Sequence, residues 1–336
     1  MILLLNKLNI VKSSILIVLY LASLNTSITT LTEIFRFDGD GEELYGVADL
    51  LPLDNGDFVI SDRLTNKVLK VSGTGKLVRL VGRDGRGPGE FSGGPDLIVE
   101  SEGLLYVFDR SASRVVQVFD HDLNYVTTIN IRIVRDAVAV NNSLMLLHYH
   151  DYLNNKFLHL YDYKGEIKSS LEHDAGSEEY TNLNYGHVLN IGKERMVLVY
   201  KHMNRIEYYN SEFELSKRVS IDSLPGQSPV YQRPGTDQIV RRFEGREREI
   251  VEKGSYWPEI NIFQSAASDG KGNVYIQVNS ELWDSENNII VLNDQGTQTD
   301  SFNLPDHQEL MAIGNDDRLY SKSASGDAVF VYQISR

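Results

Sequence analysis

The stretches NGDFVISDRLTNKVLKVSGTGKLVRLVG (Asn55–Gly82) and EGLLYVFDRSASRVVQVFDHDLNYVTTI (Glu102–Ile129) present the same elements in the same order. Each begins with a glycine turn and continues with a short apolar strand that ends in Asp-Arg. A Lys or Arg follows four residues later, and then come a second apolar strand, a polar turn and a third strand. Asp62 corresponds to Asp109 at an offset of 47 residues. This offset indicates an internal repeat, which has to be recognised before any single motif is interpreted.

Four fainter copies follow, and they start at Asn141, Lys193, Lys271 and Asp316. Short runs of Val, Ile, Leu, Tyr or Phe bounded by Gly, Asn, Asp or Ser are typical of β-strands. One further apolar run precedes each copy; these runs are GVADLLPL, PDLIVES, RDAVAV, GHVLNI, FQSAASD and ELMAI. The sequence therefore predicts six copies of four strands each. A period of about 40–50 residues with four antiparallel strands is typical of the blades of an all-β propeller.

The two ends of the repeat array complement each other. The last copy ends on its third strand, AVFVYQIS (328–335), and the missing fourth strand can come from LTEIFRF (Leu31–Phe37). Pairing these segments closes the ring and hides two sheet edges that otherwise favour aggregation. A pair of β-sandwiches is the rival architecture, but it predicts neither six matching units nor a complementary first strand. We therefore expect residues 28–336 to form a single six-bladed propeller domain.

The glycine-rich segment VGRDGRGPGEF (81–91) lies between the first two copies. A phosphate-binding P-loop requires G-x-x-x-x-G-K-[ST] followed by a helix, and a dinucleotide loop requires G-x-G-x-x-G followed by a helix. Here Gly85, Gly87 and Gly89 are spaced by two, and no helix is indicated after them. We expect this segment to connect the outer strand of one blade to the inner strand of the next, where glycine and proline allow the backbone to turn.

The region from Gly82 to Asp120 resembles the NHL-type repeat of six-bladed propellers and the TolB-like propellers. It is similar in particular to a six-bladed β-propeller family of bacterial envelope proteins, whose members carry a G-x-G-P-G-E-F element before a blade. In this sequence the element consists of Gly85, Gly87, Pro88, Gly89, Glu90 and Phe91. The resemblance implies a six-bladed fold and an extracytoplasmic location. It implies little about activity, because propellers include lyases, lactonases and binding modules.

Composition and the first residues restrict the location and the partners. The 336-residue chain has no cysteine, which excludes disulfides and thiolate metal sites, and its formal net charge of −14 argues against nucleic-acid binding. Lys7 and Lys12 precede the apolar run Ile15–Leu24, as in a secretory signal peptide. We expect residues 1–27 to be this signal and the protein to be periplasmic or secreted. An uncleaved signal anchor is the alternative, and no other membrane contact is expected.

Two sets of residues are candidate metal ligands on one face of the ring. Asp49, Asp96 and Asp136 stand near the start of three successive inner strands, where a ring of oxygens suits Ca²⁺ or Mg²⁺. The alternative is that each Asp accepts hydrogen bonds from nearby backbone N–H groups. His150, beside His148 on an expected strand, could form a zinc or iron site with His187 and His202. The alternative here is a group of ordinary surface or half-buried histidines.

Two further sets of residues are candidates for contacts with a ligand or between strands. The first inter-blade loop offers Arg83, Arg86 and Glu90 as candidate ligand-binding residues. Asp62 with Lys67, and Asp109 with Arg114, are expected to form contacts at the corner between the second and third strands of a blade.

An irregular insertion at residues 220–262 separates the fourth and fifth copies. Its apolar spacing suggests one face of a helix or two short turns, and Tyr231, Tyr256 and Trp257 could stack on a sugar or pack on a partner. A poorly ordered excursion or a strand pair on the propeller's rim are the alternatives.

The sequence favours a binding function over catalysis. We expect an exported propeller scaffold that presents the loops of one face to a protein or glycan, with calcium as a possible structural cation. The alternative is a metal-dependent lyase or lactonase that acts on a small substrate at the same face. No catalytic residue is assigned, because candidate catalytic groups do not recur in a convergent set across the copies.

Overall fold

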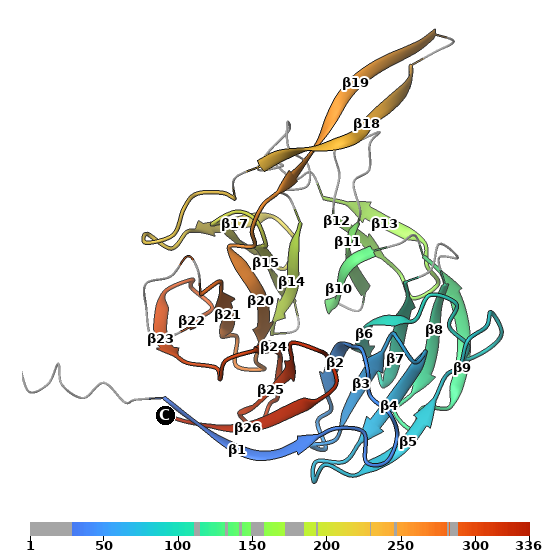
Figure 1. Ribbon diagram of the computed structural model, residues 1–336, viewed down its shortest axis with the longest axis vertical. Helices are drawn as coiled ribbons and strands as arrows, with labels where there is room; N and C mark the ends of the chain where they lie inside the picture. The colour runs from blue at the N-terminus through green and yellow to red at the C-terminus, as the bar shows by residue number, and fades with distance from the viewer. Residues whose placement is uncertain are drawn as a thin grey trace, which may run out of the picture.

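The computed structural model describes residues 29–110, 115–131, 134–140, 143–148, 158–171, 185–192, 194–228, 230–244, 247–280, 282 and 288–336, with the backbone alone for 134–135, 145–148 and 230–258. These residues contain strands and no helix. Figure 1 shows six sheets arranged around a common centre and one long hairpin that extends outward from the ring. The expected signal segment, residues 1–27, lies outside the described residues.

Each blade is an antiparallel sheet of four strands that follow one another from the centre of the ring outward. The strands of blades 1 and 2 are β2 (Val47–Pro52), β3 (Phe58–Asp62), β4 (Lys67–Val71) and β5 (Leu77–Val81), then β6 (Pro95–Ser101), β7 (Leu104–Asp109), β8 (Val115–Asp120) and β9 (Tyr125–Asn130). Those of blades 3 and 4 are β10 (Val134–Val140), β11 (Ser143–His148), β12 (Leu158–Tyr161) and β13 (Ile167–Ser170), then β14 (Gly186–Ile191), β15 (Arg195–Tyr200), β16 (Ile206–Tyr209) and β17 (Leu215–Val219). Those of blade 5 are β20 (Phe263–Ser268), β21 (Val274–Val278), β22 (Ile289–Leu292) and β23 (Gln298–Phe302).

Blade 6 confirms the predicted closure of the ring. It consists of β24 (Gln308–Ile313), β25 (Arg318–Ser323), β26 (Val329–Ser335) and, as its outer strand, β1 (Thr30–Phe37). The register runs from Thr30 opposite Ser335 to Phe37 opposite Val329. The inner strands β2, β6, β10, β14, β20 and β24 contact one another in ring order, and β24 returns to β2. The chain is therefore an all-β, six-bladed propeller.

Burial explains why the middle strands of each blade are continuous apolar runs. The buried side chains form six clusters among the described residues, and each cluster fills the space between two neighbouring blades. Second and third strands are covered on both sides, so β3 and β21 are buried throughout, whereas the outer strands β9 and β17 are mostly exposed. A strand that is covered on both faces has no polar face, which removes the usual alternation.

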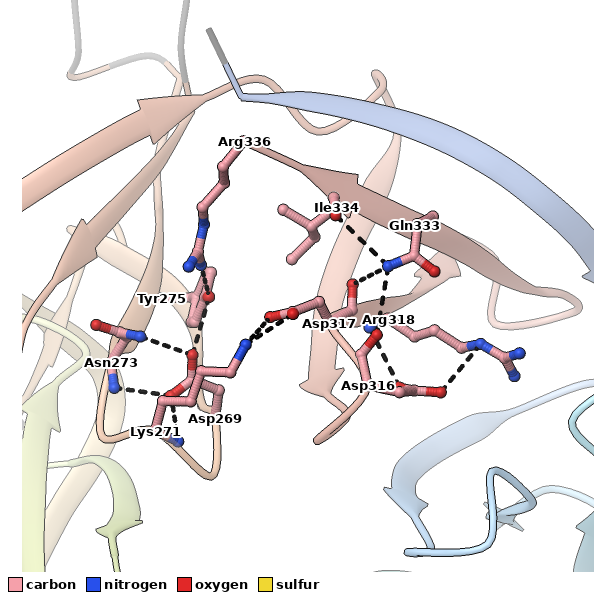
Figure 2. A network of polar contacts seen from close by, with 10 residues as sticks. All are labelled: Asp269, Lys271, Asn273, Tyr275, Asp316, Asp317, Arg318, Gln333, Ile334 and Arg336. Carbon is pink, nitrogen blue, oxygen red and sulfur yellow. Dashed lines mark hydrogen bonds and ion pairs between the residues drawn. The ribbon is translucent and has the colours of Figure 1, made fainter. Parts of the chain in front are cut away.

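Polar contacts reinforce the junction between blades 5 and 6, close to the ring closure. Figure 2 shows Lys271, in the turn after β20, with its Nζ 2.7 Å from both carboxylate oxygens of Asp317 in the turn before β25. In blade 5, the Tyr275 hydroxyl donates to Asp269 at 3.1 Å and accepts a hydrogen bond from Arg336, which follows β26. The last residue of the chain is therefore tied to the blade next to its own.

The two faces of the disk differ in what they carry. One face holds the hairpin turns that follow the inner strands, and the other holds the loops between blades and the corners after the second strands. We call the latter the corner face. In five blades the residue after the second strand donates its N–H to the carbonyl before the inner strand at 2.7–3.1 Å; the donors are Arg63, Arg110, Lys201, Asn279 and Ala324. The corner face is therefore held together by a repeated backbone contact.

Candidate functional site

The loop at residues 83–91 connects blades 1 and 2 and is held by hydrogen bonds within itself and to β8. Its N–H groups are directed inward: Gly85 N donates to Phe91 O at 3.3 Å, and Gly87 N donates to the Glu90 carboxylate at 2.8 Å. Gln117 of β8 donates to the carbonyls of Gly87 and Glu90 at 3.1 and 3.0 Å. A phosphate cradle needs such amides free, so the structure agrees with the interpretation of this segment as a connection between blades.

The predicted ligand residues of this loop differ in their surroundings. Glu90 accepts a hydrogen bond from Arg83 Nε at 2.7 Å. The Gly87 N–H and, to a smaller extent, this Arg83 contact hold the pKa of Glu90 below its usual range. Phe91 is fully buried and packs on Phe119, with ring centroids 6.4 Å apart. Glu90 is thus used within the loop, whereas Arg86 is exposed on its surface.

The corner aspartates Asp62 and Asp109 accept hydrogen bonds from backbone N–H groups. Asp62 is fully buried and accepts hydrogen bonds from the N–H groups of Tyr45 (2.8 Å), Leu64 (3.0 Å) and Thr65 (3.2 Å). Asp109 holds the equivalent loop through the N–H groups of Ser92 and Gly93, at 2.7 and 2.9 Å. Each carboxylate therefore fixes the segment that leads into the inner strand of its own blade.

The expected contact between Asp62 and Lys67 is present only as a backbone pair. These two residues lie opposite each other in the β3–β4 ladder, but Lys67 Nζ forms its ion pair with Glu42 at 2.9 Å. The predicted corner contact is therefore present in the ladder, and the Asp62 carboxylate, which accepts from three N–H groups, does not form an ion pair with Lys67 there. The second predicted partner, Arg114, lies outside the described residues.

Asp49 and Asp136 occupy equivalent positions near the axis, and Asp96 does not. The registers of β2 and β10 each shift by one extra residue, after which Asp49 lies opposite Ser61 and Asp136 opposite Leu147. In blade 2 the extra residue is Asp96 itself, and Leu97 takes the equivalent position. A β-bulge redirects the side chain of the inserted residue, and Asp96 approaches Arg63 at 3.8 Å instead.

Both aspartates connect one inner strand to the next. Asp49 accepts hydrogen bonds from Leu50 N at 2.8 Å and from Ile98 N of blade 2 at 2.7 Å. Asp136 accepts from Ala137 N at 2.8 Å and from Val188 N of blade 4 at 2.9 Å. These contacts match the alternative prediction of backbone capping. Among the described residues no group of three or more His, Asp or Glu side chains is arranged to hold a metal ion.

The surroundings of Asp49 make its carboxyl group unusually basic. The pKa of Asp49 is raised from 3.8 to about 7; burial is the largest cause, and the negative charge of Asp136 acts in the same direction. The two backbone N–H groups and the Lys322 ammonium oppose this shift. Lys322 Nζ also lies 3.4 Å from Glu309 and donates to Val47 O at 3.3 Å, so it joins blade 6 to blade 1. The axis therefore carries a mixed set of charges that link neighbouring blades.

The predicted histidine site is not assembled from the residues that the structure describes. His187 Nδ1 lies 3.5 Å from Asp136 Oδ2, and its buried Nε2 has no hydrogen-bond partner within the described part of the chain. His202 Nδ1 contacts the carbonyl of Ile260 at 3.1 Å and so serves the insertion rather than the axis. His150 lies outside the described residues, and only the backbone of His148 is described.

The insertion forms a long hairpin, which we call the arm. It consists of β18 (Val230–Glu244) and β19 (Glu247–Pro258), and it projects outward from blade 4 in Figure 1. The helix or two turns suggested by the apolar spacing do not form, whereas the alternative prediction of a strand pair is confirmed. The antiparallel register places Tyr231 opposite Trp257 and Gln232 opposite Tyr256. The three predicted aromatic residues thus lie in two adjacent cross-strand pairs at the base of the arm.

The base of the arm is fixed to the corner of blade 4. Ser228 N donates to His202 O at 2.7 Å, and Ile262 N donates to Lys201 O at 2.8 Å. Ile260 N donates to the buried Ser228 hydroxyl at 3.1 Å, which joins the two ends of the insertion. The arm therefore leaves the disk from two segments that are hydrogen-bonded to one corner and to each other.

A buried charge network lies directly behind this corner. Glu207 of β16 is fully buried; its Oε2 accepts from the hydroxyls of Tyr200 (3.0 Å) and Tyr209 (2.8 Å). Its Oε1 accepts from Arg205 Nε at 2.8 Å and from Arg218 Nε at 3.0 Å. Burial raises the pKa of both tyrosines, and the Glu207 charge raises it further. With four such partners the carboxylate is fully satisfied, which stiffens the corner that carries the arm.

Sequence reasoning did not single out Tyr45 and Leu64. Both are among the exposed large apolar residues, at 50% and 67% exposure, and Asp62 accepts a hydrogen bond from the N–H of each. They flank this one buried carboxylate on the corner face. The neighbouring Glu43 carboxylate, hydrogen-bonded to the Tyr45 hydroxyl, raises the pKa of Tyr45. An apolar residue after each corner Asp-Arg pair would have been the only sequence signal, and blade 2 has Ser111 there.

Comparison with known proteins agrees with this architecture. Residues 42–152 match the family described as 6-bladed beta-propeller, which covers blades 1 and 2 and part of blade 3. This match spans about a third of the chain, and together with the six blades described above it confirms the predicted six-bladed β-propeller fold. The narrower resemblance to NHL-type or TolB-like repeats stays a prediction. The sequence matches no protein among those with curated descriptions.

Solved structures share the fold at low sequence identity. A candidate exported protein from Bacteroides fragilis aligns with a TM-score of 0.59 at 12% identity, over 93% of this chain and 96% of that one. A protein of unknown function from Bacteroides thetaiotaomicron gives 0.53 at 11%, over 91% and 76%. A streptogramin B lyase gives 0.50 at 10%, over 91% and 98%. At these identities the likeness concerns the fold alone. Within the described residues no helix is long and apolar enough to span a bilayer.

Proposed function

We propose that this propeller is an exported binding scaffold, and that its corner face at blade 1 takes up a protein partner. The observation that carries the proposal is the double hydrogen bond of Asp62 to the N–H groups of Tyr45 and Leu64. One buried carboxylate thereby fixes the backbone beneath two exposed apolar side chains. Ordering such side chains in advance lowers the entropic cost of binding.

The residues around this pair have the composition of a protein-binding surface. Tyr45 and Leu64 offer apolar area, and Arg63 between Asp62 and Leu64 is 44% exposed at its side chain. Tyrosine and arginine are enriched at the centres of protein interfaces, where they contribute most of the binding free energy. This composition favours a protein over a glycan as the partner.

The charge of the protein suggests the chemistry of the partner. Glu42 and Glu43 are exposed directly before Tyr45, and the chain carries a formal net charge of −14. A surface of this sign accelerates the approach of a basic protein and slows that of an acidic one. We therefore propose a partner with a basic contact segment that also presents an apolar side chain to Tyr45 and Leu64.

Export is part of this proposal and rests on two supporting observations. The first residues have the pattern of a secretory signal, and a structural neighbour is a candidate exported protein. The test is processing: the purified protein from the envelope fraction should begin near residue 28. A cytoplasmic protein that retains residues 1–27 would contradict export.

The alternative function, a lyase or lactonase, retains one favourable observation. Asp136 lies 3.5 Å from His187 Nδ1, and a carboxylate in this position can orient an imidazole so that its Nε2 acts as a base or a metal ligand. The shared fold with a lyase does not extend to activity at 10% identity. Because Asp136 also serves the backbone of Val188, we favour the binding function.

The experiment that tests the binding function uses a photo-crosslinking residue at position 64 in the native host. A discrete adduct should form there, and none should form with the same residue at position 78, since Val78 on the outer strand β5 is similarly exposed at 55%. The captured protein is then purified and its affinity is measured. Tyr45→Ala and Leu64→Ser should each weaken binding about tenfold or more, and the association rate should fall as salt rises.

The matched control is Val78→Ser, which removes comparable exposed apolar area from the rim and should leave the affinity unchanged. If Tyr45→Ala, Leu64→Ser and Val78→Ser all bound with the affinity of the wild type, the captured protein would bind elsewhere, and this assignment of the face would be refuted. Crosslinking at position 78 but not at position 64 would refute it as well.

A further inference from the structure

The arm is a sheet of only two strands among the described residues. β18 and β19 pair with each other from Val230–Pro258 to Glu244–Glu247, and no other described strand joins them. A two-stranded hairpin is at best marginally stable in water, and its outer edges offer unpaired N–H and C=O groups to another chain. A long arm held by a rigid corner therefore calls for a pairing partner.

The two edges of the arm are not equivalent. In β18 the register is interrupted between Gln232 and Asp237, where four residues, including Pro234, face the single residue Ser255 of β19. A bulge and a proline both hinder pairing at a sheet edge, because they bend the strand and remove a donor. β19 has no proline before Pro258 and no inserted residue, so its edge is the one suited to a partner.

Most charged residues of β19 stand opposite a neutral or like-charged residue of β18 in the backbone register. Arg248 lies opposite Phe243, Glu252 opposite Ile239 and Lys253 opposite Gln238 in the register. Glu247 lies opposite Glu244, which is a like-charge pair. Directly opposed pairs of unlike charge stabilise a sheet and like pairs destabilise it. Four charged residues of β19 thus stand opposite a neutral or like-charged residue in the backbone register.

We propose that β19 pairs antiparallel with β19 of a second copy about a two-fold axis at Ile250. This register sets Arg248 opposite the partner's Glu252 and Glu247 opposite the partner's Lys253, and the symmetry repeats both pairs. A shift of this register by one residue is unfavourable in either direction, because it opposes like charges. One shift places Glu247 opposite the partner's Glu252, and the other places Glu249 opposite the partner's Glu252. Only Glu249, which already faces Arg242 in the hairpin, is left with a neutral partner, Val251.

The distribution of charge along the chain supports a second copy as the occupant. Two chains of net charge −14 repel each other. Residues 237–253 are locally neutral, with Arg241, Arg242, Arg246, Arg248 and Lys253 against Asp237, Glu244, Glu247, Glu249 and Glu252. A strand of this length reaches ~40 Å, several times the Debye length of ~8 Å at physiological salt. Contact at the arms therefore keeps the acidic disks beyond the range of their repulsion.

Sedimentation velocity of the purified protein tests this pairing over about 1–300 µM. The wild type should show a concentration-dependent dimer, with a dissociation constant in the micromolar range because one strand pair is a small interface. Arg248→Glu alone and Glu252→Arg alone each create two like-charge pairs and should weaken the dimer about tenfold. The double variant R248E/E252R restores opposite charges across the axis and should recover the dimer.

Asp237→Arg is the matched control, because it makes the same charge change as Glu252→Arg on the strand that does not pair. It should leave the dimer unchanged, and circular dichroism should show the same strand content for all variants. A monomer at every concentration would overturn the proposal. It would also be overturned if the double variant stayed as weak as the single ones, since that result requires a different register or occupant.

Discussion

Asp49 and Asp136 stand at the same register position of the inner strands of blades 1 and 3, and each spans to the next inner strand. Ile98 N lies 2.7 Å from Asp49 and Val188 N lies 2.9 Å from Asp136. In blade 5 the side chain of Gln277 makes the corresponding connection, because it accepts a hydrogen bond from Leu310 N of blade 6 at 2.9 Å. Two aspartates and one glutamine thus connect alternate blade junctions near the axis.

The first prediction concerns the dependence of stability on pH. The pKa of Asp49 rises from 3.8 to about 7 on folding, mainly through burial. The folded protein therefore holds a proton that the unfolded chain releases, so this group's contribution to the free energy of unfolding falls as pH rises from about 4 to about 7. The slope is at most ~1.4 kcal/mol per pH unit. Asp49→Asn should flatten the curve, as measured by urea unfolding between pH 4.5 and 8.

The neighbours of Asp49 supply the control for this assignment. The Asp136 charge raises the Asp49 pKa and the Lys322 charge lowers it. Asp136→Asn should therefore move the titration of Asp49 to lower pH, and Lys322→Met should move it to higher pH. The carboxyl carbon chemical shift of Asp49 reports this directly. Shifts in the opposite directions would contradict the electrostatic account.

The second prediction separates a structural loop from a ligand loop. Phe91 is fully buried between blades 1 and 2, so Phe91→Ala should lower the free energy of unfolding by about 3–5 kcal/mol. Arg86→Ala, five residues earlier on the exposed surface, should change it by less than about 0.5 kcal/mol. Urea unfolding of both variants provides the measurement. A small effect of Phe91→Ala would show that the loop does not hold these blades together.

The third prediction addresses the corner beneath the arm. Glu207→Gln leaves the Arg205 guanidinium, 13% exposed at its side chain, without its charge partner and should cost about 3–5 kcal/mol. The comparison is Asp294→Asn, whose ion pair with Arg195 is about 40% exposed on both sides and should contribute about 1 kcal/mol or less. Thermal unfolding of the two variants tests the difference. Equal effects would mean that the buried network does not stiffen the corner.

The repeat pattern was enough to predict the architecture. The inner strands PDLIVES and GHVLNI coincide with β6 and β14, and the predicted closure by LTEIFRF is the β1–β26 pair. Such predictions succeed because the alternation of short apolar runs and polar turns is imposed by burial between blades. The arm was harder to predict, because residues 230–258 are not packed in a blade and their apolar spacing does not distinguish a helix from a hairpin.

Side-chain roles depended on details that spacing does not contain. Asp96 looked equivalent to Asp49 in the aligned copies, yet a single extra residue in β6 gave that position to Leu97. His202 looked like a partner of His187, but the insertion returns to its corner and engages it through Ile260. A β-bulge determines the position of Asp96, and a tertiary contact determines the partner of His202. Neither feature can be recognised by aligning the repeat copies.

Closure of the ring by β1 has a consequence for how the molecule is made. Synthesis proceeds from the N-terminus. About 300 further residues must therefore be synthesised after Thr30 before its ladder partner, Ser335, is available to pair with it. Until then the first strand has no sheet to join, and the cluster that contains Phe37, Phe58 and Tyr320 cannot form. Contacts of such long sequence separation form slowly and late. A chain whose synthesis stops early therefore leaves an open ring with exposed apolar surface. Chaperones and proteases bind such surface, so ring closure distinguishes full-length chains from truncated ones.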